Sequence, residues 1–230
     1  MSELLVRREE GVLVVTLNRP EKANALNETI YAGLVDVLKE QEKDEGIRAV
    51  VLASAGEKAF SAGADLKQFA EDGPATAGAK RRALLVRTLE AFIDFPKPLV
   101  AALQAQALGA GLMLAALADE VVAAEGAKLG MPEMKHGMPS PIGIAILVSR
   151  MGRRAAERLV QSGEPVSAAQ GTQLGLVDCV VSLHQLEKHS LERAGALGAL
   201  SARAFAVNKR FSAAKLRQEL DAARRYVDAA

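Results

Sequence analysis

Uninterrupted apolar runs alternate along the chain with segments whose apolar residues recur every three or four positions. The runs predict strands at residues 13–17, 49–52, 99–103 and 120–124, and a short further strand is expected at residues 128–130. Strands that are apolar throughout are typical of a parallel sheet whose two faces are both covered by helices. The pattern therefore predicts an α/β fold with a largely parallel sheet.

The segments with helical periodicity lie between these runs. Asn27 is a plausible N-cap for a helix whose apolar face carries Ile30, Leu34, Val37 and Leu38. A break over residues 72–78 precedes a basic amphipathic stretch, which predicts a second helix ending near Asp94.

The last third of the chain has a mainly helical pattern. Helices dominate from about Ile142 onward, with a candidate N-cap at Ser167 and a break at Gly171–Thr172. The lone cysteine, Cys179, lies in a short strand-like run, where we expect it to be a small core residue. A single cysteine excludes an internal disulfide and fits a reducing cytosol.

Two glycine-centred segments, residues 60–67 and 108–113, each follow a predicted strand. The second opens a helix with no large side chain at its start, and the first N–H groups of a helix lack partners within it. Two such N–H groups brought together form a pocket for a carbonyl oxygen that becomes an oxyanion. Glu133 follows as the only carboxylate in an apolar, glycine-rich stretch, where burial would raise its pKa. The sequence thus places an acid/base beside an oxyanion pocket.

Composition argues against several classes of function. The chain has 29 basic and 28 acidic residues and a net charge of +1, so neither nucleic acid nor an anionic membrane is required as a partner. Aromatic residues make up 3% and Trp is absent, which disfavours stacking on bases. With no membrane-length apolar run and no signal-peptide core, we expect a cytoplasmic protein. The spacing of His, Cys, Asp and Glu suggests no metal site.

Four segments in register resemble the enoyl-CoA hydratase/isomerase (crotonase) superfamily. They are residues 17–26, 59–66, 97–102 together with 108–111, and Pro132–Glu133, and residues 175–178 match a later motif. The resemblance covers about residues 4–182. It implies a crotonase-type spiral of ββα units over residues 1–182. A helical C-terminal region over residues 183–230 would follow, shorter than is usual in the family.

The resemblance also implies roles for individual residues. Ala64 and Ala110 would supply two oxyanion-hole N–H groups, and Glu133 would move a proton beside the thioester. The expected contacts to the CoA thioester are Lys22, Ala23, Ala25, Ala62, Gly63, Asp65, Leu66, Lys67, Gly109, Gly111 and Met113. Lys22 and Lys67 are equally well read as solvent-exposed. Asp65 is expected to brace its loop by accepting backbone hydrogen bonds, and His136 is a candidate for the pocket edge.

Met113 bears on the choice of reaction. Hydratases of the family carry a second glutamate twenty residues before the first, and that position here is Met113. A thioether cannot activate water, whereas moving one proton between two carbons needs a single base. The resemblance therefore implies an enzyme that isomerises the double bond of an enoyl-CoA. Enoyl-CoA hydratase activity and a catalytically weak acyl-CoA-binding protein are the alternatives.

The remaining expectations concern partners. Coenzyme A would be part of the substrate, with no separate cofactor, and the family's assembly would be a homotrimer or a dimer of trimers. The acyl pocket would be lined by Leu, Met and Ala from about residues 68–92. The basic clusters at Lys80–Arg82 and at Arg150 with Arg153–Arg154 are expected to be solvated helix faces, or alternatively to meet CoA phosphates.

Overall fold

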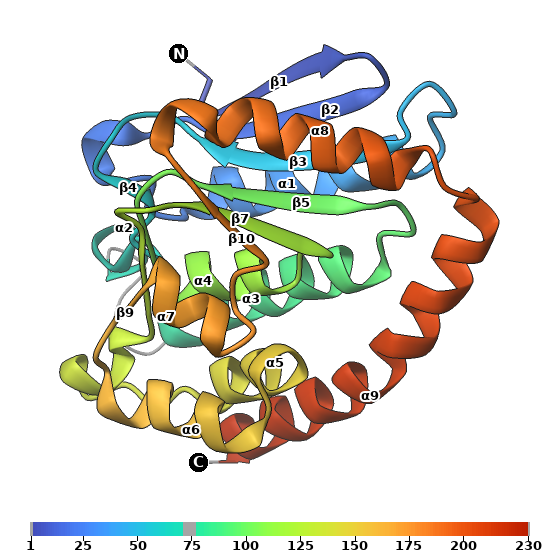
Figure 1. Ribbon diagram of the computed structural model, residues 1–230. Helices are drawn as coiled ribbons and strands as arrows, with labels where there is room; N and C mark the ends of the chain where they lie inside the picture. The colour runs from blue at the N-terminus through green and yellow to red at the C-terminus, as the bar shows by residue number, and fades with distance from the viewer. Residues whose placement is uncertain (1, 71–76, 230) are drawn as a thin grey trace.

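A six-stranded sheet forms the centre of the computed structural model, which describes residues 2–70 and 77–229 (Figure 1). Its strands, in spatial order, are β1 (Leu4–Glu9), β2 (Val12–Leu17), β3 (Ala49–Ser54), β5 (Leu99–Leu103), β7 (Glu120–Ala124) and β10 (Cys179–Val181). Only β1 pairs antiparallel with its neighbour; the other pairings are parallel. The predicted parallel α/β sheet is confirmed.

Both faces of this sheet are buried over β2, β3, β5 and β7, which explains why these central strands are almost entirely apolar. Leu13, Val50 and Ala101 belong to the larger apolar cluster, together with residues of α1 (Glu28–Glu42) and α3 (Ala77–Asp94). Their strand neighbours Val14 and Val51 belong to a second cluster with α8 (Leu186–Gly198). The period-two alternation of a strand therefore points apolar side chains into both layers.

A second, smaller sheet lies beside the first. Its order is β4 (Ala59–Ser61), β6 (Gln106–Leu108), β8 (Lys128–Gly130) and β9 (Val166–Ser167), and each of the first three strands follows a strand of the large sheet in the chain. Two strands, one in each sheet, followed by a helix make the repeating ββα unit. The carboxyl ends of these short strands carry the segments that form the candidate site.

Helices fill the space around the sheets. They are α2 (Leu66–Ala70), α4 (Ala110–Ala116), α5 (Pro141–Met151), α6 (Arg153–Ser162) and α7 (Ala168–Gln173), with the 3₁₀ turns η1 (Pro20–Lys22), η2 (Pro132–His136) and η3 (Leu183–Gln185). Asn27 caps α1 by accepting a hydrogen bond from Ile30 N–H at 2.9 Å, as predicted. Ser167 caps α7 in a capping box with Gln170.

The predicted helix break at Gly171–Thr172 is wrong, because α7 continues to Gln173 and the chain turns at Gly175 with φ +79°. A Cβ atom at Gly171 would lie 2.9 Å from Val177 Cγ2, so this glycine serves close packing and does not end the helix. The predicted break at residues 72–78 lies outside the described residues up to residue 76. Residues 77 and 78 already belong to α3.

The long C-terminal helix α9 (Ala202–Ala229) leaves the sheet and packs along α5 and α3, as Figure 1 shows in red. Lys209 fixes its first half by pairing with Asp119 at 2.5 Å, and burial lowers the pKa of this lysine despite that partner. Its last turns are tied to α3 by the pair Arg82–Asp228 at 3.0 Å. Within the described residues, no helix is both long and apolar enough to cross a membrane.

Candidate active site

A pocket of about 260 Å³ lies where the loop after β4, the start of α4 and the turn η2 meet. Its lining contains nine of the candidate site residues from the sequence: Ala62, Gly63, Ala64, Leu66, Gly109, Ala110, Met113, Glu133 and His136. Helix α3 and the end of α9 close the other side with Leu85 and Val227. Segments far apart in the chain thus form one cavity.

Gly63 and Gly109 allow the two glycine loops to touch. Their φ angles are +93° and +52°, a region that residues with a side chain rarely adopt. A Cβ atom at Gly63 would lie 3.1 Å from Leu108 O and 3.5 Å from Ala110 N. Only glycine therefore lets the backbone of one loop lie directly against the backbone of the other.

This contact brings two unpaired amides to the pocket. Within the described residues, neither the N–H of Ala64 nor that of Ala110 donates a hydrogen bond, although the neighbouring amides of Gly63, Asp65 and Gly109 all do. A buried N–H without a partner is rare in folded proteins. The two amides that sequence reasoning chose as donors are thus available to a ligand oxygen.

Glu133 lies at the start of η2, opposite these amides. Its Oε1 atom lies close to Gly109: a Cβ atom added to Gly109 would be only 2.8 Å from this oxygen. Its Oε2 atom is buried and has no hydrogen-bond partner among the described residues. Burial raises the pKa of Glu133, and its own backbone N–H and the charges of His136 and Arg81 offset this only in part. A carboxylate held in this way is suited to accept a proton near neutral pH.

Met113 lines the same pocket and is almost fully buried. It is 3% exposed, and its Cε atom lies 3.2 Å from the point that a Cβ atom of Gly143 would occupy. Ser140 Oγ lies 2.5 Å from that same point, and this hydroxyl makes no hydrogen bond within the described part of the chain. The sequence pattern gave no sign of the place of Ser140 beside Met113.

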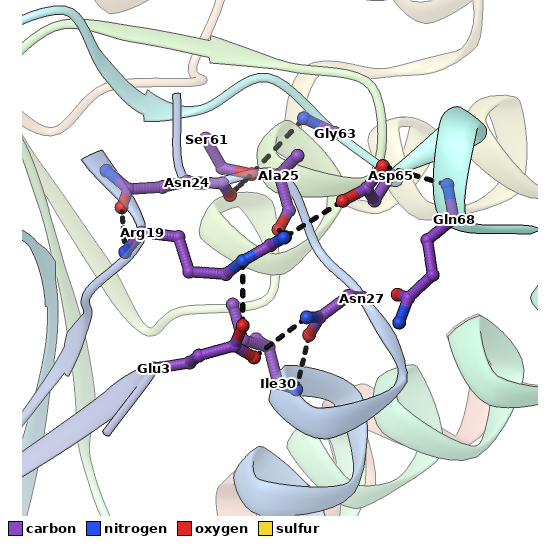
Figure 2. Close-up of polar contacts among 10 residues, drawn as sticks. All are labelled: Glu3, Arg19, Asn24, Ala25, Asn27, Ile30, Ser61, Gly63, Asp65 and Gln68. Carbon is purple, nitrogen blue, oxygen red and sulfur yellow. Dashed lines mark hydrogen bonds and ion pairs between the residues drawn. The ribbon is translucent and has the colours of Figure 1, made fainter. Parts of the chain in front are cut away.

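The loop that carries Ala64 is braced by the segment before α1, as Figure 2 shows. Asp65 accepts a hydrogen bond from Gln68 N–H at 3.2 Å and pairs with Arg19 at 3.0 Å. Burial alone would raise the pKa of Asp65, but these two partners hold it below the usual range. Arg19 also pairs with Glu3 at 3.0 Å. The bracing interpretation of Asp65 is thus supported by its contacts.

The same brace explains why residues 19–26 carry a distinctive motif. Asn24 adopts φ +51°, is 1% exposed, and donates hydrogen bonds to the carbonyls of Ala55 and Ala59, each at 2.9 Å. Ser61 Oγ donates to Asn24 O at 2.9 Å and accepts from Gly63 N–H at 3.2 Å. Polar side chains buried in this way fix the conformation of the loop at Gly63.

Six predicted contact residues lie outside the pocket lining, and one of them is Asp65 in the braced loop. Lys22, Ala23 and Ala25 belong to the 19–26 turn, whose backbone bonds to the 62–65 loop: Ala62 N–H donates to Ala23 O at 2.9 Å. Lys67 is exposed on α2. Gly111 lies behind the pocket, where a Cβ atom would come within 2.5 Å of Ser61 Cβ.

Sequence reasoning was wrong about one basic cluster. Arg81 and Arg82 were expected on a solvated helix face, but both line the pocket from α3. The prediction of an acyl pocket lined by Leu, Met and Ala from residues 68–92 was correspondingly incomplete. Leu85 comes from that stretch, whereas the methionines Met113 and Met138 come from other segments. The periodicity could have shown this, because Gly78, Arg81 and Leu85 share a helix face.

Comparison with known proteins identifies the family. The family model described as enoyl-CoA hydratase/isomerase matches residues 7–229. The chain belongs to the enoyl-CoA hydratase/isomerase family. The resemblance drawn from the glycine loops and Glu133 is thereby confirmed, as is the expectation of an enzyme of hydratase or isomerase type.

Members of this enoyl-CoA hydratase/isomerase family with both kinds of name are similar to the chain. The 2,3-dehydroadipyl-CoA hydratase of Escherichia coli (strain K12) is 42% identical over 181 residues, which are 78% of this chain and 69% of that protein. An enoyl-CoA hydratase structure from Mycobacterium smegmatis has a TM-score of 0.87 at 33% identity, covering 99% of this chain and 88% of that one. A monofunctional enoyl-CoA isomerase from M. smegmatis has a TM-score of 0.80 at 27% identity, covering 94% and 95%.

Proposed function

We propose that the protein isomerises the double bond of an enoyl-CoA, with Ala64 and Ala110 holding the thioester oxygen and Glu133 moving the proton. The observation that carries this proposal concerns the described residues: two amides at the pocket have no hydrogen-bond partner among them, and Glu133, the one carboxylate in the described lining, has an unpartnered oxygen. The amides would stabilise the negative charge that develops on the thioester oxygen as a proton leaves the α-carbon.

One base is sufficient for this reaction. The carboxylate of Glu133 takes a proton from the α-carbon of a 3-enoyl-CoA, and the electron pair enters the conjugated enolate. The same proton is then delivered to the γ-carbon, so that the double bond moves from the β,γ to the α,β position. The product has the atoms of the substrate, and no water and no separate cofactor is consumed.

Hydration is the second candidate, and one observation favours it. The hydroxyl of Ser140 has no hydrogen-bond partner among residues 2–70 and 77–229, and it lies beside Met113, the position of the missing second carboxylate. Ser140 is 8% exposed and lines the pocket, so its hydroxyl would be able to hold a water molecule near the substrate. A hydroxyl is a much weaker base than a carboxylate, which is why we place isomerisation first.

The two reactions are separated by one pair of assays. The purified protein is given 3-enoyl-CoA and trans-2-enoyl-CoA of the same chain length, and the absorbance of the conjugated thioester is followed. Isomerisation predicts a gain of absorbance with the first substrate and little loss with the second. Rapid loss with the second, abolished in Ser140→Ala, would establish hydration instead.

A further inference from the structure

Helix α3 presents two arginines to a pocket that is otherwise mainly apolar. Gly78, Arg81, Arg82 and Leu85 line the pocket with the spacing of one helix face. Around them lie apolar side chains, namely Met113, Met138 and Ile142. Glu133 is the only carboxylate among the described lining residues, so cations outnumber anions in the cavity.

Of the two arginines that line the pocket, Arg81 is the one without an ion-pair partner in the described part of the chain. Arg82 pairs with Asp228 at 3.0 Å, and Lys80 pairs with Glu28 at 2.8 Å. Arg81 is half-buried and makes no ion pair or hydrogen bond within residues 2–70 and 77–229. A guanidinium that is partly removed from water without a partner is unfavourable unless an anion completes it.

Glu133 does not serve as that anion. Arg81 is close enough for its charge to lower the pKa of Glu133, yet the two side chains form no ion pair. The space that separates them belongs to the pocket, which both residues line. A substrate bound with its α-carbon at Glu133 would therefore extend its acyl chain towards Arg81.

The coenzyme A phosphates are a poorer match for Arg81. The resemblance places the CoA path along the turn that contains Lys22, Ala23 and Ala25, and this turn bonds through its backbone to the loop that carries Ala64. None of these three residues lines the pocket, whereas Arg81 does. Arg81 therefore belongs to the cavity beside Glu133, whereas the residues of the expected CoA path do not.

Resting on the proposed function, we infer that Arg81 binds a carboxylate at the far end of the acyl chain, so that the preferred substrates are enoyl-CoA esters of dicarboxylic acids. The planar guanidinium matches a carboxylate with two parallel hydrogen bonds. The methionines and Ile142 contact the methylene groups between the two ends. Arg82 adds positive charge to the pocket, but its ion pair with Asp228 leaves it less free to bind the substrate carboxylate.

The test compares enoyl-CoA esters of equal length that end in a methyl group or in a carboxylate, over a series of chain lengths. The wild-type protein should have the higher kcat/KM for the carboxylate-ended ester at one optimal length. Arg81→Met should lose about 10- to 100-fold on that ester and less than about threefold on the methyl-ended one. Arg81→Lys should restore part of the preference. Arg87→Met, an exposed arginine on the same helix, is the matched control and should change neither.

Calorimetric binding of the corresponding saturated esters and of free CoA accompanies the kinetics. If no ester is turned over, the proposed function fails, and the ratio of binding constants for the two saturated esters still decides the role of Arg81. Equal losses on both esters, with a displaced pH profile, would mean that Arg81 only tunes Glu133. Weaker binding of free CoA to Arg81→Met would assign Arg81 to a phosphate. Either result, or a wild-type preference for the methyl-ended ester, would overturn the inference.

Discussion

Replacing Gly109 by alanine tests the geometry of the site with a single methyl group. Gly109 has φ +52° and ψ −125°, a conformation that costs about 1–3 kcal/mol for a residue with a side chain. For a chain of 230 residues this corresponds to a melting temperature lower by about 2–12 °C. The added Cβ atom would also lie 2.8 Å from Glu133 Oε1, which is too close for a carbon–oxygen contact.

The carboxylate of Glu133 must move away from this methyl group, since the backbone on the other side cannot. A displacement of about 1 Å at a reacting group lowers the rate by about 10²-fold. We therefore expect Gly109→Ala to remain folded and to lose about 10²-fold in kcat. Gly195→Ala on α8 is the control, because a Cβ atom there would meet nothing within 4 Å. Full activity in Gly109→Ala would refute the placement of Glu133 against this glycine.

Three further substitutions probe the two amides, the missing carboxylate and the buried charge. Ala110→Pro deletes one unpaired N–H at a position where proline is tolerated, and should cost on the order of 3 kcal/mol in transition-state stabilisation; normal turnover in a variant with unchanged circular dichroism would place the oxyanion elsewhere. Met113→Glu should raise the rate at which a short trans-2-enoyl-CoA is hydrated, while lowering the free energy of unfolding by about 1–3 kcal/mol. A folded variant that binds substrate but hydrates it no faster would show that this position does not separate isomerisation from hydration. Burial raises the pKa of Glu133, so between the unfolded and the folded pKa the native state binds more protons than the unfolded state, and stability falls as the pH rises through this range. Glu133→Gln should therefore melt at a higher temperature than wild type at neutral pH, and at about the same temperature as wild type below the ordinary glutamate pKa. An equal difference in melting temperature at both pH values would contradict this cause.

The parts of the fold that depend on local pattern were predictable. The continuous apolar strands and the Asn27 cap follow from side-chain period and short-range hydrogen bonding, and both are present. Strand β1 was missed because most of its side chains are exposed and its apolar run, residues 4–6, is followed at once by charged residues. The helix break expected at Gly171 was wrong because this glycine makes room for Val177. That contact is not visible in the local sequence pattern.

The site was predictable where backbone chemistry decides it and unpredictable where long-range packing does. Gly63, Gly109 and Glu133 could be predicted from the sequence because few other residue types can fill their roles in a close backbone contact and in proton transfer. The brace between Arg19 and Asp65 joins segments 46 positions apart, so it appears only in the folded chain. The same holds for Val227, which reaches the pocket only because α9 returns along α5.

The central claim is that Glu133 moves the proton while the two amides hold the thioester. It is tested most directly by measuring turnover and calorimetric acyl-CoA binding of Glu133→Gln beside wild type, with Glu125→Gln, an exposed glutamate, as control. The amide keeps the shape of the side chain but cannot accept the proton. We expect turnover to fall by about 10²- to 10⁴-fold while the binding constant changes by less than about tenfold. Turnover near that of wild type, with substrate bound normally, would contradict the account.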